Sequence, residues 1–180
     1  MKSKLLILDI DETLLHATEE PLELEHHFET KLYYVYQRPF LNEFLQFCIK
    51  HFKVAVWTTG GEEFAYTMVD NIFPDNYPLE FIWSKDRCTH VFDPELYQNG
   101  YLKNLKKVKK KGYRLEEVLM IDDTPSKLKK NYGNLVTIAE FTANQDDKEL
   151  LRLMKYLEVL NQVENILKVE KRGWEKKYQV

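Results

Sequence analysis

Residues 5–13 read Leu5-Leu6-Ile7-Leu8-Asp9-Ile10-Asp11-Glu12-Thr13, and this stretch decides the fold. A short, fully apolar run that ends abruptly in acidic residues is typical of a buried parallel strand. Similar apolar runs occur at 52–57, 79–83, 118–121 and 135–139, and amphipathic stretches of helical period lie at 40–48, 64–72 and 150–159. Strands that alternate with helices predict a doubly wound α/β domain, in which helices cover both faces of a parallel sheet.

Three segments fall outside this alternation. Residues 14–37 contain no clear helix and end in a β-prone run, so we expect a flap or hairpin over the strand ends. Residues 85–101 contain Pro94 and an Asn-Gly pair, which predict a loop. Residues 163–180 are charged and are expected to form a helical tail, either packed on the core or binding a partner. We therefore place the domain at 1–162 and the tail at 163–180.

The composition is that of a folded domain. Apolar residues make up 44% of the 180 residues, which is enough to bury a core. No apolar run approaches the roughly 18 residues that a bilayer span needs. The two cysteines, Cys48 and Cys88, form neither a disulfide framework nor a zinc knuckle. With no signal-peptide pattern at the N-terminus, these features predict a cytoplasmic protein without a membrane partner.

The charge is spread unevenly along the chain. Residues 1–100 carry 8 basic and 17 acidic residues, whereas residues 101–180 carry 18 and 12, and the net charge is −3. A net negative chain is no generic nucleic-acid binder. The basic stretch 103–114 has no stacking residue except Tyr113, so it reads as a solvated helix face. We expect no nucleic-acid partner.

Polar residues follow several of the predicted strands at the points where these strands end. In an open α/β sheet, ligands bind outside the carboxyl ends of the strands. The residues at these ends are Asp9 and Asp11, Thr58 and Thr59, and Asp122 and Asp123, and Lys103 lies upstream of the last pair. Clustered carboxylates repel one another unless a cation neutralises them, and ligands that are all oxygen select Mg²⁺ over zinc. The sequence therefore predicts a site for Mg²⁺ and phosphate at this rim of the sheet.

These residue types suit phosphoryl transfer. One carboxylate can attack phosphorus and form an aspartyl-phosphate. A second carboxylate two positions on can protonate the leaving oxygen and then activate water. Thr58 can bond a phosphate oxygen, and Lys103 can supply positive charge to the transferring group. We therefore expect a Mg²⁺-dependent phosphomonoester hydrolase.

Other nucleophiles and metal ligands fit less well. A cysteine phosphatase needs arginine six positions after its cysteine, and Cys88 has Pro94 there. His26, His27 and His90 lack a second ligand at helical or finger spacing, so zinc is not expected.

The stretch from Asp9 to His16 resembles the first motif of the haloacid dehalogenase superfamily. The form of this motif is that of NLI-interacting-factor-like phosphatases, which include the small phosphatases of the RNA polymerase II C-terminal domain. Further similarity covers residues 38–45 with Trp57-Thr58, residues 100–105, residues 122–125 and residues 146–157. The resemblance spans residues 4–160 and includes all four motifs of the superfamily.

The resemblance implies a three-layer α/β/α, Rossmann-like core with a short flap and no large cap domain. Asp9 would be the nucleophile and Asp11 the acid/base, with the Asp11 carbonyl also on Mg²⁺. Thr58, with Thr59 beside it, and Lys103 would hold the phosphate.

Asp122 and Asp123 would complete the metal shell in this family. The relatives have Asp-Asn at these two positions, which leaves open which of the two acids binds the metal directly. Lys85 stands where the relatives carry an arginine that helps to hold substrate, so Lys85 is a further candidate substrate-binding residue.

The length of the flap bears on the substrate. The 24 residues of 14–37 are too few for a cap domain that encloses a small metabolite. An open site favours a phosphorylated protein or peptide, because the bulky partner itself excludes water. Six glutamates lie from Glu12 to Glu29 with no Lys or Arg among them, so basic flanking residues are favoured. A small phosphate ester, or a non-catalytic phosphate- or peptide-binding scaffold, is the alternative, and the oligomeric state stays open.

Overall fold

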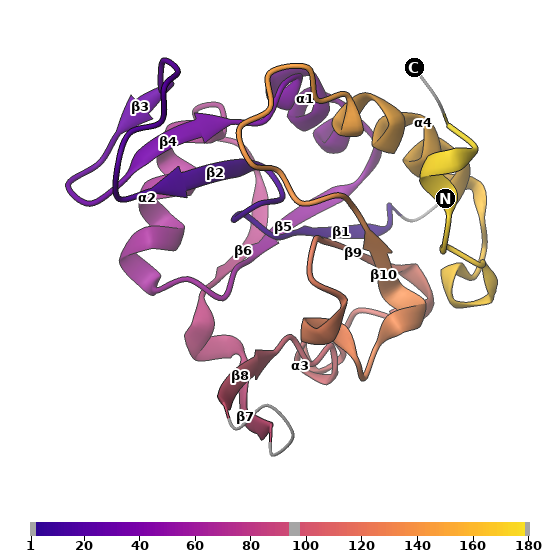
Figure 1. Ribbon diagram of the computed structural model, residues 1–180. Helices are drawn as coiled ribbons and strands as arrows, with labels where there is room; N and C mark the ends of the chain where they lie inside the picture. Colours follow the sequence, from indigo (N-terminus) through magenta and orange to yellow (C-terminus); the bar gives the residue numbers. More distant parts are fainter. Residues whose placement is uncertain (1–2, 94–97, 179–180) are drawn as a thin grey trace.

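A five-stranded parallel sheet forms the centre of the computed structural model, which describes residues 3–93 and 98–178 (Figure 1). Its strand order is β10-β9-β1-β5-β6, and Leu5 of β1 lies opposite Lys53 of β5 and Val118 of β9. The strands are β1 (Leu5–Leu8), β5 (Lys53–Trp57), β6 (Leu79–Trp83), β9 (Val118–Asp122) and β10 (Leu135–Thr137). Each predicted apolar run thus corresponds to a strand of this sheet. These strands are largely apolar because both faces of the sheet are covered by other elements.

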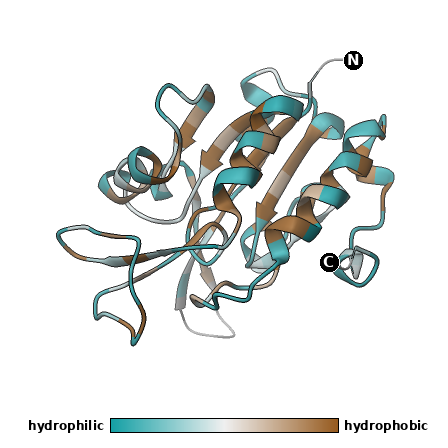
Figure 2. Cartoon of the chain, turned by 90° about the horizontal axis from the view of Figure 1, so that it is seen from above, coloured by the Kyte–Doolittle hydropathy of each residue, from teal (hydrophilic) through white to brown (hydrophobic). Residues whose placement is uncertain are grey.

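The helices pack mainly on one face of the sheet. They are α1 (Leu41–His51), α2 (Glu62–Ile72) and α4 (Glu149–Gln162), and their apolar residues join one core cluster with β1, β5 and β9. Figure 2 shows α1 and α4 over brown strands, with teal residues on their outward faces. The other face is covered by the short α3 (Lys106–Lys110) and by 3₁₀ turns. No helix in residues 3–93 or 98–178 is long and apolar enough to cross a membrane.

A small antiparallel sheet follows β1 and forms the flap. It consists of β2 (Leu15–Thr18), β3 (Phe28–Glu29) and β4 (Tyr34–Gln37) in the order β2-β4-β3. Arg38 fastens the base of this flap, because its buried guanidinium donates to the carbonyls of Thr13 and Ala139 and forms two hydrogen bonds with Asp147. The expected β-rich flap is therefore present, and it is held to the core by a buried ion pair.

The expectation of a loop at 85–101 is wrong. After a 3₁₀ turn (Lys85–Arg87), strands β7 (Thr89–Asp93) and β8 (Gln98–Leu102) form an antiparallel hairpin in which Val91 lies opposite Gly100. The β-prone residues of β7 find a partner strand, and pairing outweighs the turn signals of the Asn-Gly dipeptide. Pro94, the other residue behind that expectation, lies outside the described residues.

The expectation of a helical tail is also wrong for the described residues 163–178. This segment contains two 3₁₀ turns, Ile166–Lys168 and Trp174–Lys176, with Gly173 at φ 69° between them. The positive φ at Gly173 interrupts any helix there. Ile166 and Trp174 are buried, and Trp174 stacks on Tyr156 of α4 with 5.2 Å between ring centroids. Of the two alternatives for the tail, packing on the core is therefore the observed one.

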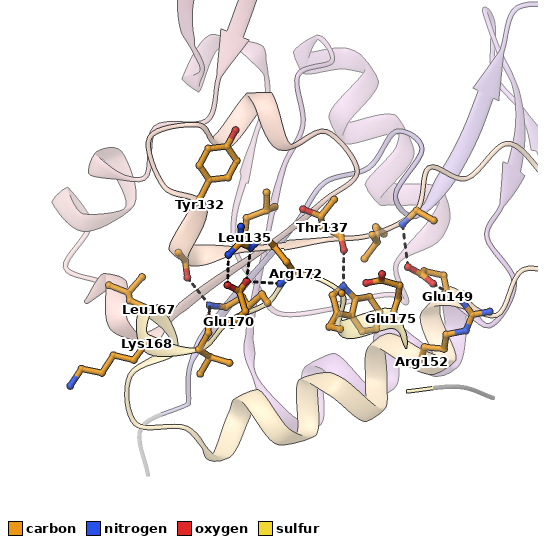
Figure 3. Close-up of a pocket in the computed structure, with 17 residues that line it drawn as sticks. Tyr132, Leu135, Thr137, Glu149, Arg152, Leu167, Lys168, Glu170, Arg172 and Glu175 are labelled. Carbon is orange, nitrogen blue, oxygen red and sulfur yellow. Dashed lines mark hydrogen bonds and ion pairs between the residues drawn. The ribbon is translucent and has the colours of Figure 1, made fainter. Parts of the chain in front are cut away.

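The tail encloses a hollow of about 1030 Å³ with α4 and the outer edge of β10, which we call the edge pocket (Figure 3). The Trp174 indole donates to the Thr137 carbonyl at 2.8 Å, and the Lys171 ammonium donates to the Gly133 carbonyl at 2.8 Å. Glu170 pairs with Arg172 at the surface. Polar groups of the tail thus satisfy carbonyls of the β10 strand and of the turn before it.

Candidate active site

The first strand places two carboxylates at the rim. Asp9 follows β1 directly, is fully buried, and donates its backbone N–H to the Ile121 carbonyl of β9 at 3.0 Å. The chain then turns tightly around the Ile10 carbonyl, which accepts the N–H of Leu14 at 2.8 Å, while Glu12 adopts φ 53°. This turn keeps Asp11 beside the end of the neighbouring strand β5.

Thr58 follows β5 and meets Asp11 there. Its hydroxyl donates to Asp11 Oδ2 at 3.0 Å and accepts the backbone N–H of Gly60 at 2.8 Å. A Cβ at position 60 would lie 2.7 Å from the Phe64 ring and 3.3 Å from the Thr58 hydroxyl, so glycine allows this close turn. Thr59, the next predicted residue, is half-buried beside Thr58.

Strand β9 ends in Asp122, and the Asp122 side chain is fully buried. Asp122 Oδ1 accepts the backbone N–H of Thr124 at 2.9 Å, and Asp123 Oδ2 accepts the Thr124 hydroxyl at 2.8 Å. Pro125 then opens a 3₁₀ turn (Pro125–Leu128). The tight turn thus orders both carboxylates by local hydrogen bonds.

The Lys103 ammonium bridges the carboxylates at the ends of β1 and β9. Lys103 follows β8, its side chain is fully buried, and its ammonium lies 2.8 Å from Asp9 Oδ1 and 2.6 Å from Asp122 Oδ2. A buried lysine needs such partners, because an unpaired ammonium in the interior is costly. The sequence predicted that Asp9, Lys103 and Asp122 would meet, and the structure brings them into contact.

Lys127 is a charged residue of this site that the sequence analysis missed. Its ammonium lies 3.1 Å from Asp9 Oδ2, 3.6 Å from Asp122 Oδ1 and 3.7 Å from Asp123 Oδ1. The signal available in the sequence was its place four residues after Asp123, just beyond Pro125. We refer to Asp9, Lys103, Asp122, Asp123 and Lys127 as the rim cluster.

Three carboxylates of the rim cluster could hold a metal ion. Asp9, Asp122 and Asp123 can each offer one oxygen, and these oxygens lie within 4.8 Å of one another. Asp123 Oδ1 is buried and accepts no hydrogen bond. In an all-oxygen set, a buried carboxylate oxygen that accepts no hydrogen bond, and whose ion-pair partner Lys127 is 3.7 Å away, fits a hard cation such as Mg²⁺. The Asp11 carboxylate lies outside this group of three and bonds Thr58 instead.

The acidic groups at the rim are strongly perturbed. Burial and the negative charges of Asp9 and Glu12 raise the pKa of Asp11 to about 7, against the opposing hydrogen bond from Thr58. Burial and the charge of Asp9 raise the pKa of Asp122 to about 6. Burial opposes ionisation of Asp9 as well, but Lys103 and Lys127 hold its pKa below the usual value. The positive charges of the two lysines thus outweigh burial at Asp9 but not at Asp122.

Lys85 and Cys88, two further residues considered in the sequence analysis, lie near the rim cluster but are not part of it. Lys85 is exposed, and its backbone N–H donates to the Gly60 carbonyl at 2.9 Å. Among the described contacts, none joins the Lys85 side chain to the rim cluster. Cys88 is buried, its thiol lies 3.9 Å from the Thr58 carbonyl, and burial raises its pKa. A thiol in that state is a poor nucleophile.

Comparisons with known proteins identify the family and the fold of the chain. The model of the NLI interacting factor-like phosphatase family matches residues 4–167. CTD small phosphatase-like protein 2 of Dictyostelium discoideum is 33% identical over 168 residues, covering 89% of this chain and 28% of that protein. Nuclear envelope morphology protein 1 of Saccharomyces cerevisiae is 28% identical over 189 residues, covering 92% of this chain and 42% of that protein. The chain thus spans less than half the length of either relative.

A solved structure shares the fold. The structure of Fcp1, an essential RNA polymerase II CTD phosphatase, matches with a TM-score of 0.68 and 17% sequence identity. The match covers 89% of this chain and 62% of the Fcp1 chain. The expected Rossmann-like α/β core is therefore confirmed.

Proposed function

The chain belongs to the NLI interacting factor-like phosphatase family, and from this premise we propose that it is a Mg²⁺-dependent phosphomonoester hydrolase. The observation that carries the proposal is the rim cluster itself. Residues from separate segments of the chain place a lysine between two buried aspartates, at distances of 2.8 and 2.6 Å. Such a buried, charge-dense group at the carboxyl ends of parallel strands is suited to a phosphate ester rather than to packing.

In this proposal Asp9 is the nucleophile. One of its oxygens attacks phosphorus, forming the aspartyl-phosphate bond as the ester P–O bond breaks. Lys103 and Lys127 support this role, because their positive charges keep the Asp9 carboxylate ionised at neutral pH. Burial also removes the competing water that would solvate this carboxylate.

Asp11 is the proposed general acid and base. Its carboxyl group would give its proton to the leaving oxygen, and its carboxylate would then take a proton from the water that attacks the phosphorus. This second step returns Asp9 to a free carboxylate and releases inorganic phosphate. The hydrogen bond from Thr58 to Asp11 Oδ2, at 3.0 Å, supports the role because it fixes the orientation of the carboxyl group.

Thr58, Thr59 and Lys103 are the proposed phosphate-binding residues, with Lys85 as an outer candidate. Thr58 and Thr59 lie in the turn after β5, beside Asp11. Lys103 contacts the nucleophile, so its charge lies beside the phosphoryl group during transfer. Lys85 is held near this turn by its backbone bond to Gly60.

Mg²⁺ is the proposed cofactor, held by Asp9, Asp122 and Asp123 and by the Asp11 carbonyl. When bound, it would reduce the repulsion between the attacking carboxylate and the anionic phosphate. Asp123 Oδ1 accepts no hydrogen bond, which supports direct ligation by Asp123 as well as by Asp122.

A phosphorylated protein or peptide is the proposed substrate. The names of the CTD phosphatase relatives point to this class. The flap has no helical cap, and five exposed glutamates at 19, 20, 23, 25 and 29 line it. These charges favour a peptide with basic residues beside the phosphate. A cytoplasmic location stays a prediction from the sequence, and cell fractionation can test it.

One experiment tests the activity and the substrate class together. Wild type, Asp9→Asn and the exposed control Asp70→Asn are assayed with and without Mg²⁺ on an aryl phosphate and on phosphopeptides that differ only in flanking charge. We expect Mg²⁺-dependent turnover by wild type and Asp70→Asn, an activity loss of at least about 10³-fold in Asp9→Asn, and the highest kcat/KM with basic flanks.

Each alternative predicts a different result. If wild type is no faster than Asp9→Asn, the protein is a phosphate- or peptide-binding scaffold. If every peptide is slow but one small metabolite is hydrolysed efficiently, the substrate class is wrong and the mechanism stands. A preference for acidic flanks would contradict the role given to the flap.

A further inference from the structure

The reaction proposed above uses Lys127 only to keep Asp9 ionised, although the Lys127 ammonium lies close to all three aspartates of the rim cluster. It lies within 4 Å of oxygens of Asp9, Asp122 and Asp123. These are the same three carboxylates whose oxygens lie close enough together to hold one metal ion. A protein cation and a metal ion are therefore directed at the same ligands.

The two lysines of the cluster divide the carboxylate oxygens between them. Lys103 lies against Asp9 Oδ1 and Asp122 Oδ2. Lys127 lies against the other oxygen of each aspartate, Asp9 Oδ2 and Asp122 Oδ1, and also near Asp123 Oδ1. With Lys103 in place, the oxygens left for a metal ion are those that face Lys127.

The two lysines also differ in freedom. The Lys103 side chain has no exposed surface, whereas the Lys127 side chain is 18% exposed. Their backbones are joined, because the Lys103 N–H donates to the Lys127 carbonyl at 2.8 Å. The backbone of Lys127 is thus fixed, but its four-carbon side chain can swing outward, as the side chain of Lys103 cannot.

We propose that Lys127 is a built-in counter-cation that competes with Mg²⁺ for Asp9, Asp122 and Asp123. Its ammonium must leave these carboxylates before the metal ion binds, and this requirement sets the metal affinity of the site. The inference rests on the proposed function insofar as the site takes Mg²⁺. It adds that, in the protein without metal, the Lys127 ammonium reduces the repulsion among these three carboxylates.

The test measures Mg²⁺ binding and needs no turnover. Protein freed of metal with EDTA and dialysed is titrated with Mg²⁺ by calorimetry, using wild type, Lys127→Met and Lys130→Met. Lys130 is exposed and lies three residues away, so its variant removes the same charge without the contacts. We expect Lys127→Met to bind Mg²⁺ about tenfold tighter than wild type, since the competing ion pair no longer has to be broken. Lys130→Met should stay within about twofold of wild type, because its charge is exposed and screened.

A second measurement uses wild type alone and covers the case in which Lys127→Met does not fold. Lysine acylation is followed by peptide mass spectrometry with and without Mg²⁺. We expect the acylation rate of Lys127 to rise at least about threefold on metal binding because its ammonium is released, while Lys103 stays protected and Lys130 is unchanged. Unchanged Lys127 reactivity in protein saturated with Mg²⁺ would overturn the proposal.

The Asp122→Asn variant separates this inference from the proposed function. If wild type binds Mg²⁺ through Asp122 and Lys127→Met binds no more tightly, the competition is wrong and the metal site stands. If neither protein binds Mg²⁺ in a manner that Asp122→Asn abolishes, the metal site and the inference both fail.

Discussion

The rim cluster and the edge pocket both hold charged side chains, but they balance these charges in different ways. The members of the rim cluster come from separate segments of the chain, and Asp9, Lys103 and Asp122 are fully buried. In the edge pocket, Glu170 pairs with Arg172 only two residues away, and both side chains are largely exposed. The first arrangement depends on the whole fold, whereas the second is local.

This difference shows which region is suited to chemistry. The edge pocket is a hollow of about 1030 Å³, yet its two buried donors, the Lys171 ammonium and the Trp174 indole, are used up on backbone carbonyls of the protein itself. In the rim cluster, Asp123 Oδ1 is buried without a hydrogen bond, and the Lys127 ammonium that pairs with it is 3.7 Å away. A site that binds and transforms a charged group needs charge left unmatched in the resting protein. Unmatched charge, rather than the volume of a hollow, therefore locates the candidate active site.

Among the substitutions that compare the two regions, replacing Lys103 with methionine should have the largest effect. Asp9 and Asp122 would then face each other without the ammonium now 2.8 and 2.6 Å away. We expect the free energy of unfolding in EDTA to fall by about 4 kcal/mol, the cost of breaking a buried ion pair. The rate of phosphate ester hydrolysis should fall by about 10²-fold or more. Urea denaturation and steady-state kinetics measure the two effects.

Lys106→Met is the matched control for this change, because Lys106 is exposed and lies three residues along the chain. Its stability and activity should match those of wild type. A Lys103→Met protein as stable as wild type would mean that the rim cluster is no more tightly coupled than the edge pocket.

Trp174→Ala tests the edge pocket and should lower stability without changing activity. Trp174 is buried, stacks on Tyr156 and donates to the Thr137 carbonyl. We expect the free energy of unfolding to fall by about 3 kcal/mol, as is usual for removal of a buried tryptophan. Trp174→Phe keeps the stacking, and loses about 1 kcal/mol with the hydrogen bond. The kcat/KM of either folded variant should equal that of wild type, and a selective loss of kcat/KM would tie the edge pocket to catalysis.

The sequence predicted the core of the fold well because its signal is local. A strand buried on both faces must be apolar throughout. Strands such as Leu5–Leu8 and Val118–Asp122 are therefore recognisable in the sequence as apolar runs that lead to an aspartate. Parallel strands bring their carboxyl ends to one edge, which is why Asp9 and Asp122 could be placed together without coordinates. Lys103 was harder to place, because it stands in a lysine-rich stretch, and its role was predicted from its position between Thr58 and Asp122 together with the family resemblance.

The parts that the sequence did not predict depend on contacts between distant segments. Lys127 looks like one more surface lysine, and its place is set by the bond from the Lys103 N–H to its carbonyl. The β7–β8 hairpin is a local exception, in which Val91 pairs with Gly100 although Gly100 belongs to the Asn-Gly pair that favours a turn. The tail binds the core through Trp174, whose partner Thr137 lies 37 residues earlier. The hydrophobic periodicity of a sequence reveals local structure and does not predict such contacts.

Arg172→Gln should have the smallest effect, although its ion pair is as short as that of Lys103. The Arg172 guanidinium lies 2.6 Å from Glu170 Oε2, the same distance that separates Lys103 from Asp122. Water and salt screen the exposed pair and leave it little net value, whereas burial removes that screening from the rim. We expect no measurable change in melting temperature, or in kcat/KM at low and physiological salt. The double variant with Glu170→Gln should behave the same way. If Arg172→Gln slowed a phosphopeptide but not an aryl phosphate, the edge pocket would be holding substrate, and unmatched charge would no longer be the criterion that separates the two regions.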